Sequence, residues 1–208
     1  MRAVCFALAL CALPSAGALA QGMYGSPEDG FYLELAAGYA QFTDNDRDIG
    51  GGIEAGVEYG PGFEVRGQAG YKFSYFRAGV ELQYAQTNFD ALSVAGMGID
   101  ADGSPSVWRT TVNGYFDLDN QSRFTPYAGG GLGLAFVSGD EISAGGVTYD
   151  LEDETVFTFN VDAGVAIDLN ETIALVPAYR YVWLDTGSSE WFDNDTAHIG
   201  EVGLRFRF

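Results

Sequence analysis

The sequence predicts an all-β fold, an eight-stranded antiparallel barrel that is joined as an up-and-down meander and crosses a membrane. Three observations lead to this prediction. Apolar and polar residues alternate at period two over eight segments, which is typical of strands with two different faces. The segments are about 10–13 residues long, close to the length that a tilted strand needs to cross hydrocarbon. The connections between them are alternately short and long, as in membrane barrels.

The first 20 residues have the features of a secretory signal peptide. Arg2 precedes an apolar run over residues 3–13, and the small residues Ala18 and Ala20 stand where a signal peptidase reads the chain. We therefore expect cleavage before Gln21. Both cysteines lie inside this segment, so the exported chain is expected to form no disulfide although it enters an oxidising compartment.

After a short lead-in over residues 21–30, the barrel domain is expected over residues 31–208. Its first four strands are predicted at 31–40, 63–73, 76–84 and 109–118. In each of them one face is apolar or aromatic, and the other carries charged, amide or small side chains. The residues of these four strands that alternate against the apolar face include Glu34, Glu64, Arg66, Lys72, Arg77, Glu81, Arg109 and Asn113.

The last four strands are predicted at 124–136, 157–167, 173–183 and 198–208. The fifth strand carries glycines opposite its apolar face, and the sixth and seventh each set one charge there, Asp162 and Arg180. The eighth alternates an apolar set with a charged one. Its two faces are Val202, Leu204, Phe206 and Phe208 against Glu201, Gly203, Arg205 and Arg207.

The orientation of these faces distinguishes a soluble barrel, whose apolar face turns inward, from a membrane barrel, whose apolar face meets lipid. Aromatic residues gather at the ends of the apolar faces, as the interfacial girdles of membrane barrels require. The opposite face mixes charges of both signs with small residues, which suits a narrow lumen. We therefore expect a charge network in the lumen, formed by Glu34, Arg66, Arg77, Glu81, Arg109, Asp162, Arg180, Glu201 and Arg205.

This network supports two hypotheses. Buried charges must be paired, so facing carboxylates and guanidiniums would plug and stiffen the barrel. The same set would also suit a narrow conduit that opens when the pairs rearrange.

Several segments carry a family resemblance. Residues 161–169 and 177–185 resemble the penultimate hairpin of the small outer-membrane β-barrels of Gram-negative bacteria, the OmpA-type and opacity-type barrels. Residues 127–133 are similar to the fifth strand of that family, and residues 198–208 to its closing strand. The resemblance implies an outer-membrane location and the porin-like naming of many members. The chain departs from full-length OmpA-type proteins, because no peptidoglycan-binding domain is expected after the barrel.

The same resemblance implies that the terminal aromatic is a signal read by the barrel-assembly machinery. The residues concerned are Val202, Leu204, Phe206 and Phe208.

The formal net charge is −19, which argues against nucleic acid as a partner. Of the 29 acidic residues, 18 fall on the four long connections, where Arg47 is the only basic residue. Such loops suit solubility, and they also suit binding to anionic lipopolysaccharide through divalent cations. Residues 44–50 resemble the start of a calcium loop, but the glycine is one position late and Ala55 stands where a glutamate is needed. No specific metal site or cofactor is expected.

Catalysis is not expected, although some small outer-membrane barrels are lipid A-modifying enzymes. Acyl transfer needs a nucleophile within hydrogen-bond reach of a base. The only histidine, His198, belongs to the lipid-facing set, with Ser188, Ser189 and Glu190 across the fourth long connection. The sequence therefore favours a monomeric outer-membrane barrel with a structural or surface-interaction role. A narrow porin or gated channel is the alternative, and a lipid A-modifying enzyme is a weaker one.

Overall fold

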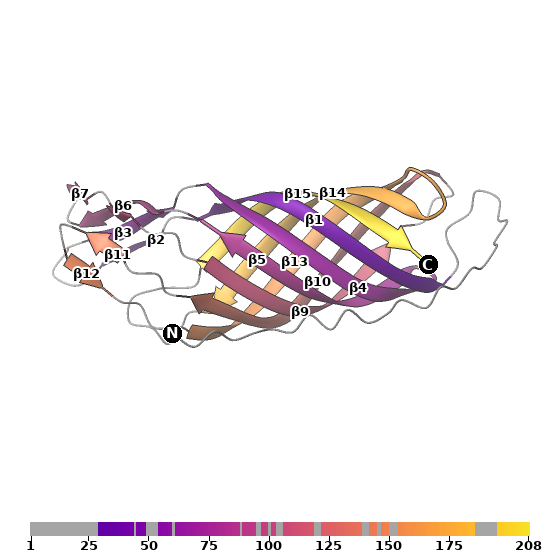
Figure 1. The fold of residues 1–208 in the computed structure, drawn as a ribbon, viewed down its shortest axis with the longest axis horizontal. Coiled ribbons are helices and arrows are strands. Elements are labelled where there is room, and N and C mark those ends of the chain that lie inside the picture. Colours follow the sequence, from indigo (N-terminus) through magenta and orange to yellow (C-terminus); the bar gives the residue numbers. More distant parts are fainter. Residues whose placement is uncertain are drawn as a thin grey trace.

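The computed structural model places eight antiparallel strands in a closed barrel, as predicted (Figure 1). The structure describes residues 29–43, 45–48, 54–59, 61–87, 89–94, 97–99, 101–102, 106–118, 122–138, 142–144, 147–149, 154–185 and 195–208. The expected signal peptide and residues 21–28 of the expected lead-in lie outside these ranges. No helix in the described ranges is long and apolar enough to span a membrane.

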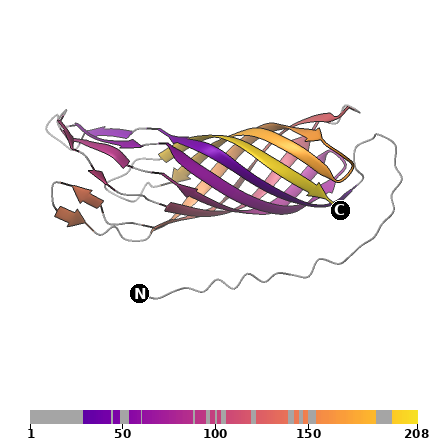
Figure 2. The ribbon, with the colours of Figure 1, turned by 45° about the horizontal axis from the view of Figure 1, so that its top comes forward.

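The barrel strands follow one another around the wall in chain order. They are β1 (Gly30–Phe42), β4 (Gly62–Phe73), β5 (Phe76–Gln86), β9 (Ser106–Asp117), β10 (Phe124–Ser138), β13 (Glu154–Asp168), β14 (Ile173–Asp185) and β15 (Asp195–Arg207). β1 pairs with β4 on one side and with β15 on the other, which closes the barrel (Figure 2). Most strands run two or three residues further than predicted towards the long connections, because backbone pairing continues past the alternating segment.

The long connections contain strands that the sequence analysis did not predict. They are β2 (Asn45–Asp48), β3 (Glu54–Tyr59), β6 (Phe89–Val94), β7 (Met97–Ile99), β8 (Ala101–Asp102), β11 (Ile142–Ala144) and β12 (Val147–Tyr149). They form two sheets, ordered β2-β3-β6-β7 and β12-β11-β8, beyond the barrel end opposite the C-terminus (Figure 1). Each of these strands is too short to show a clear alternation of apolar and polar residues in the sequence. Each sheet also pairs strands that come from different long connections.

The opposite end has short turns, as expected. Between β4 and β5 the chain reverses over Ser74 and Tyr75, and Ser74 adopts a left-handed φ of 52°. The Ser74 backbone N–H donates to the Asp29 carboxylate at 2.6 Å, so this turn is tied to the residue that precedes β1. The two ends of the barrel therefore differ, with extended sheets at one and tight turns at the other.

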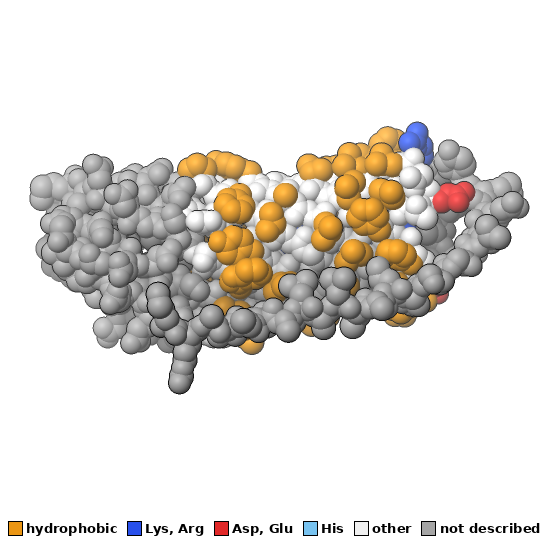
Figure 3. All heavy atoms as spheres, in the orientation of Figure 1, with side chains coloured by type: hydrophobic (Ala, Val, Ile, Leu, Met, Phe, Trp, Pro, Cys, Tyr) orange, Lys and Arg blue, Asp and Glu red, His pale blue; other side chains and the backbone are white. Residues whose placement is uncertain are grey.

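The apolar faces of the strands point outward. Phe31 is 68% exposed and Val112 is 62% exposed, whereas the alternating positions of the same strands are buried. Figure 3 shows two groups of hydrophobic side chains on the described wall, one towards each end, with a paler zone of backbone and other side chains between them. An outer surface of this kind is stable against lipid and matches the aromatic girdles of membrane barrels.

Candidate functional site: the filled lumen

Inward-facing side chains fill the barrel in three layers along its axis. The layer next to the extended sheets is apolar, the middle layer is charged, and the layer next to the short turns is built around tyrosines. An eight-stranded barrel has an interior just wide enough for side chains to fill, so each layer can close the lumen.

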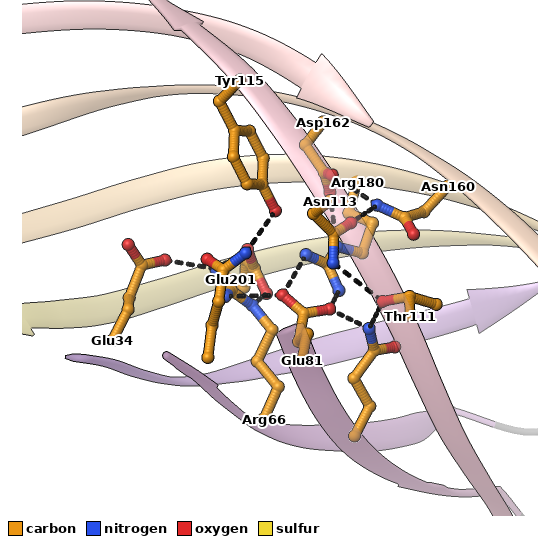
Figure 4. A network of polar contacts seen from close by, with 12 residues as sticks. Glu34, Arg66, Glu81, Thr111, Asn113, Tyr115, Asn160, Asp162, Arg180 and Glu201 are labelled. Atoms are coloured by element: carbon orange, nitrogen blue, oxygen red, sulfur yellow. Dashed lines mark hydrogen bonds and ion pairs between the residues drawn. The ribbon is translucent and has the colours of Figure 1, made fainter. Parts of the chain in front are cut away.

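Arg66 is at the centre of the charged layer (Figure 4). Its guanidinium donates to Glu34 at 2.6 Å, to Glu81 at 3.0 Å, and to both carboxylate oxygens of Glu201 at 2.9 and 2.7 Å. The three carboxylates come from β1, β5 and β15, and Arg66 comes from β4. One cation therefore links four strands across the lumen.

Arg180 forms the second centre. It donates to both oxygens of Glu81, at 2.6 and 3.0 Å, and to Asp162 at 2.5 Å. Arg180 and Glu81 are both 0% exposed. Because Glu81 is bonded to Arg66 as well, it joins the two centres into one continuous network. Desolvated charges are stable only when paired in this way.

The other predicted charges extend the network towards both ends. Arg205 donates to Glu34 at 2.6 Å, and Arg109 is paired with Glu64. The Arg77 Nε donates to both oxygens of Asp117 at 2.9 Å. The structure thus buries and pairs all nine residues of the expected set, namely Glu34, Arg66, Arg77, Glu81, Arg109, Asp162, Arg180, Glu201 and Arg205.

Two carboxylates of the network were missing from the predicted set. One is Glu64, which the sequence predicts on the polar face but which is not in the predicted charge network. The other is Asp117, which is not in the predicted set at all. Asp117 stands two residues after Tyr115 and four after Asn113, so the same period-two alternation identifies it as inward-facing. The buried charges of the described lumen are then six acids and six bases, so their formal charge is balanced. They are Glu34, Glu64, Glu81, Asp117, Asp162 and Glu201 with Arg66, Lys72, Arg77, Arg109, Arg180 and Arg205.

Amides and hydroxyls fill the space beside the charges. Asn160 donates to Asn113 at 3.0 Å and to Asp162 at 2.5 Å, and Asn113 donates to Thr111 at 2.8 Å. Gln83 is bonded to Glu81. These contacts hold the carboxylates in place from a second side, although the Gln83 and Asn160 side-chain oxygens themselves are buried without a hydrogen-bond partner in the described part of the lumen.

The layer next to the short turns encloses the Arg77 guanidinium in aromatic rings. Its carbon lies 4.6 Å from the ring centre of Tyr115, 4.9 Å from that of Tyr127 and 5.4 Å from that of Tyr32. The Arg205 guanidinium lies 5.3 Å from the Tyr127 ring centre. Cation–π contacts of this type strengthen when water is excluded.

The layer next to the extended sheets is built around an apolar cluster, and the inward-facing Arg109 lies beside it as the cross-strand neighbour of Ala135. The cluster consists of Ala40, Ala135, Val156, Val182, Leu184, Ala197 and Ile199, with Phe42, Val107 and Val137 packed against them. A hydrophobic constriction resists the passage of ions, because nothing there replaces their hydration shell. The sequence pattern predicts a polar lumen face throughout, so this apolar layer differs from the prediction.

The remaining predicted residues lie outside the lumen. His198 points outward, and its Nδ1 lies 2.5 Å from the Tyr179 hydroxyl. Ser188, Ser189 and Glu190 lie outside the described residues. On the last strand Val202, Leu204 and Phe208 are exposed. No group of three His, Cys, Asp or Glu that suits a metal ion occurs in the described ranges.

Most acidic side chains of the long connections lie outside the described part of the chain. Glu154 and Asp185 are the two whose side chains are described, and they are half-buried and exposed respectively. The expected calcium-loop resemblance at residues 44–50 is likewise outside the described side chains.

Comparison with protein families matches residues 4–208 to a model described as an outer membrane protein beta-barrel domain. A Brucella suis protein whose name states no function is 26% identical over 175 residues, which are 76% of this chain and 61% of that protein. The chain therefore spans about three fifths of that relative. A Rickettsia bellii protein named as an adhesin is 24% identical over 179 residues, covering 78% of this chain and 75% of that protein.

Two solved structures share the fold. OprG from Pseudomonas aeruginosa superposes with a TM-score of 0.62 at 16% identity, covering 90% of this chain and 99% of that chain. Neisserial surface protein A superposes with a TM-score of 0.60 at 23% identity, covering 86% of this chain and 97% of that chain. At these identities the likeness concerns the fold alone.

Proposed function

Because the chain belongs to the outer membrane protein β-barrel family and is located in the cell outer membrane, we propose that it is a closed barrel that presents acidic loops for surface interaction. Its barrel acts as a rigid, ion-tight support, and the interacting part is formed by the four long connections.

The observation that carries this proposal is the paired network across the lumen. Arg66 and Arg180 together form ion pairs with five carboxylates and reach from one side of the barrel to the other. The apolar layer and the Arg77–tyrosine layer lie on either side of this network. An ion would have to displace all three layers, so the closed state is the stable one.

The surface-interaction part rests on the loops and on the relatives. The long connections hold 18 of the 29 acidic residues, and a Rickettsia bellii relative is named as an adhesin. We propose that these loops bind lipopolysaccharide through divalent cations, and that the barrel is a monomer inserted by the barrel-assembly machinery.

Conductance in planar bilayers tests the closed barrel. The purified protein is expected to show small or no steady openings, whereas Glu81→Ala, which removes a shared partner of Arg66 and Arg180, is expected to raise conductance or lower thermal stability. Large steady openings of the unmodified protein would overturn the proposal.

Lipopolysaccharide binding tests the loops. Binding of purified lipopolysaccharide is expected in calcium and is expected to be lost in EDTA. A variant that converts Asp150, Glu152, Asp153 and Glu154 to the matching amides should bind less tightly in calcium. Equal binding in calcium and in EDTA would contradict cation bridging.

A narrow gated conduit is the second candidate, and one observation favours it. Glu64 Oε1, Arg77 Nη2 and Arg205 Nη2 are buried and make no hydrogen bond within the described part of the barrel. Buried polar atoms of this type attract ordered water, which would form the start of a water path. Brief openings that follow changes of voltage would support this candidate.

A further inference from the structure

A groove of about 620 Å³ crosses the outer surface of β4, β1, β15 and β14. It is a shallow, open depression and not an enclosed cavity. Tyr39 and Phe63 line one side, Pro177 and Val202 line the lower part, and Gly200 forms the floor. The groove belongs to the membrane-facing wall and is separate from the lumen network.

Gly200 makes this groove possible. It pairs directly with Tyr39 on β1 and with Tyr179 on β14. Both tyrosines are strongly exposed, at 59% and 48%, and no atom lies within 4 Å of the position that a Cβ of residue 200 would take. The result is a depression over Gly200 that is lined by Tyr39 on the β1 side, and Tyr179 stands beside this depression without lining it.

A polar group lies just beyond the residues that line the groove, on the same outward face of β15. His198 lies two residues before Gly200, nearer the extended sheets, and faces the same way. The Tyr179 hydroxyl lies 2.5 Å from His198 Nδ1, and the Tyr181 ring centre lies 5.4 Å from the imidazole centre. When the phenol donates to Nδ1, the ring proton is on Nε2. Within the described residues no acceptor is bonded to Nε2.

We propose that the groove binds an ester-linked lipid of the outer leaflet, with one acyl chain lying along it and His198 Nε2 donating to the ester carbonyl. Two arguments identify this occupant. The groove is continuous with the lipid-facing surface, so acyl chains are what meets it. The apolar groove also has the His198 donor next to it on the side of the extended sheets, an arrangement that matches the junction of acyl chain and carbonyl in a lipid. This inference rests on the outer-membrane location and not on whether the lumen conducts.

Native mass spectrometry of the detergent-purified protein tests the proposal with two probes, dimyristoyl phosphatidylcholine and its diether analogue with chains of equal length. The unmodified protein should retain one diester lipid about three- to tenfold better than the diether, the range expected for one hydrogen bond. His198→Phe should abolish this preference, while both lipids are still retained through their hydrocarbon chains. Gly200→Leu should lose retention of both lipids, because its side chain fills the groove.

Ala69→Leu is the matched control, since Ala69 is an exposed outward-facing residue of β4 that does not line the groove. It should retain both lipids like the unmodified protein. Folding of each variant is checked by migration on unheated gels. Equal retention of diester and diether by the unmodified protein would overturn the donor role of His198. Retention by folded Gly200→Leu at the unmodified level, or equal losses in Gly200→Leu and Ala69→Leu, would overturn the groove as a lipid site.

Discussion

Arg66 illustrates what a single residue does in this lumen. Its planar guanidinium contacts Glu34, Glu81 and Glu201 at once. A lysine ammonium is a point charge and does not offer this fork of donors. Glu34 and Glu81 each have a second cationic partner, which is Arg205 for Glu34 and Arg180 for Glu81. For Glu201, the ion-pair partner in the described part of the lumen is Arg66.

Arg66→Gln is expected to lower the free energy of unfolding by about 3–5 kcal/mol, because it leaves Glu201 buried without a cation. Urea unfolding in detergent micelles measures the change. The free energy of unfolding of Arg66→Lys should lie between those of the unmodified protein and Arg66→Gln, because lysine keeps the positive charge but lacks the planar set of donors. The control is Arg123→Gln at an exposed arginine that donates to the Asp168 carbonyl oxygen, where about 0.5 kcal/mol or less is expected. Equal effects at Arg66 and Arg123 would show that the network contributes little.

Phe208 is a second residue with a testable role, because a function as an assembly signal can be distinguished from simple packing. It is 68% exposed, and its backbone N–H donates to the Phe31 carbonyl oxygen at 3.0 Å. Deletion of Phe208 is expected to impair assembly in cells while refolding in detergent is nearly normal, because a lost assembly signal acts before folding. A simple packing role would instead remove about 1–3 kcal/mol from the folded barrel. Normal assembly of the truncated chain in cells would contradict the signal.

At the scale of the element, the β4–β5 pair shows how glycines make room for large inward side chains. Gly70 and Gly79 face each other across the two strands. A Cβ on Gly79 would lie 2.8 Å from the Tyr32 hydroxyl and 2.8 Å from the Ala69 carbonyl oxygen. The absence of side chains there lets the Tyr32 ring reach Arg77 across the lumen.

Gly79→Ala is therefore expected to destabilise the barrel by about 1–3 kcal/mol through overpacking against Tyr32. The matched control is Gly67→Ala on β4, whose Cβ would meet only Leu35 Cδ2 at an ordinary 3.5 Å on the outer surface. The midpoints of urea unfolding compare the two variants. A loss at residue 67 as large as that at residue 79 would indicate a general effect of glycine replacement.

At the scale of the whole molecule, closure is the main source of robustness. Each barrel strand pairs with a strand on both sides, and β1 completes the ring by pairing with β15. A closed ring leaves no barrel edge with unpaired backbone groups in lipid. The three layers of side chains in the lumen also connect the strands to one another from inside the barrel.

The folded protein is accordingly expected to resist dodecyl sulfate and to migrate differently on gels before and after boiling. A sample unfolded in urea before loading provides the control and should migrate like the boiled one. Identical migration of verified, membrane-inserted protein in both conditions would argue against a closed barrel.

Much of the architecture was predictable because it depends on local alternation. The number of strands, their inside-out faces and the burial of residues such as Arg180 all follow from period two, which needs only neighbouring residues. Asp117 continues the same alternation two residues after Tyr115, so its inward position was predictable as well. Two features were not predictable in this way. They are the apolar layer that includes Val182 and Leu184, which shares the inward face with the charges, and the two sheets of the long connections.

The sequence by itself determined the fold class, the face on which each charge lies, and the asymmetry between acidic long connections and short turns. Only the tertiary structure decided which charges meet. Arg66 and Glu201 are 135 residues apart, and Arg180 reaches Glu81 from across the barrel. Their heights in the lumen depend on the tilt and stagger of all eight strands together, a property of closure that no single strand contains. The same stagger places Gly200 beside Tyr39 and next to Phe63, Pro177 and Val202, which together line the groove on the outer wall.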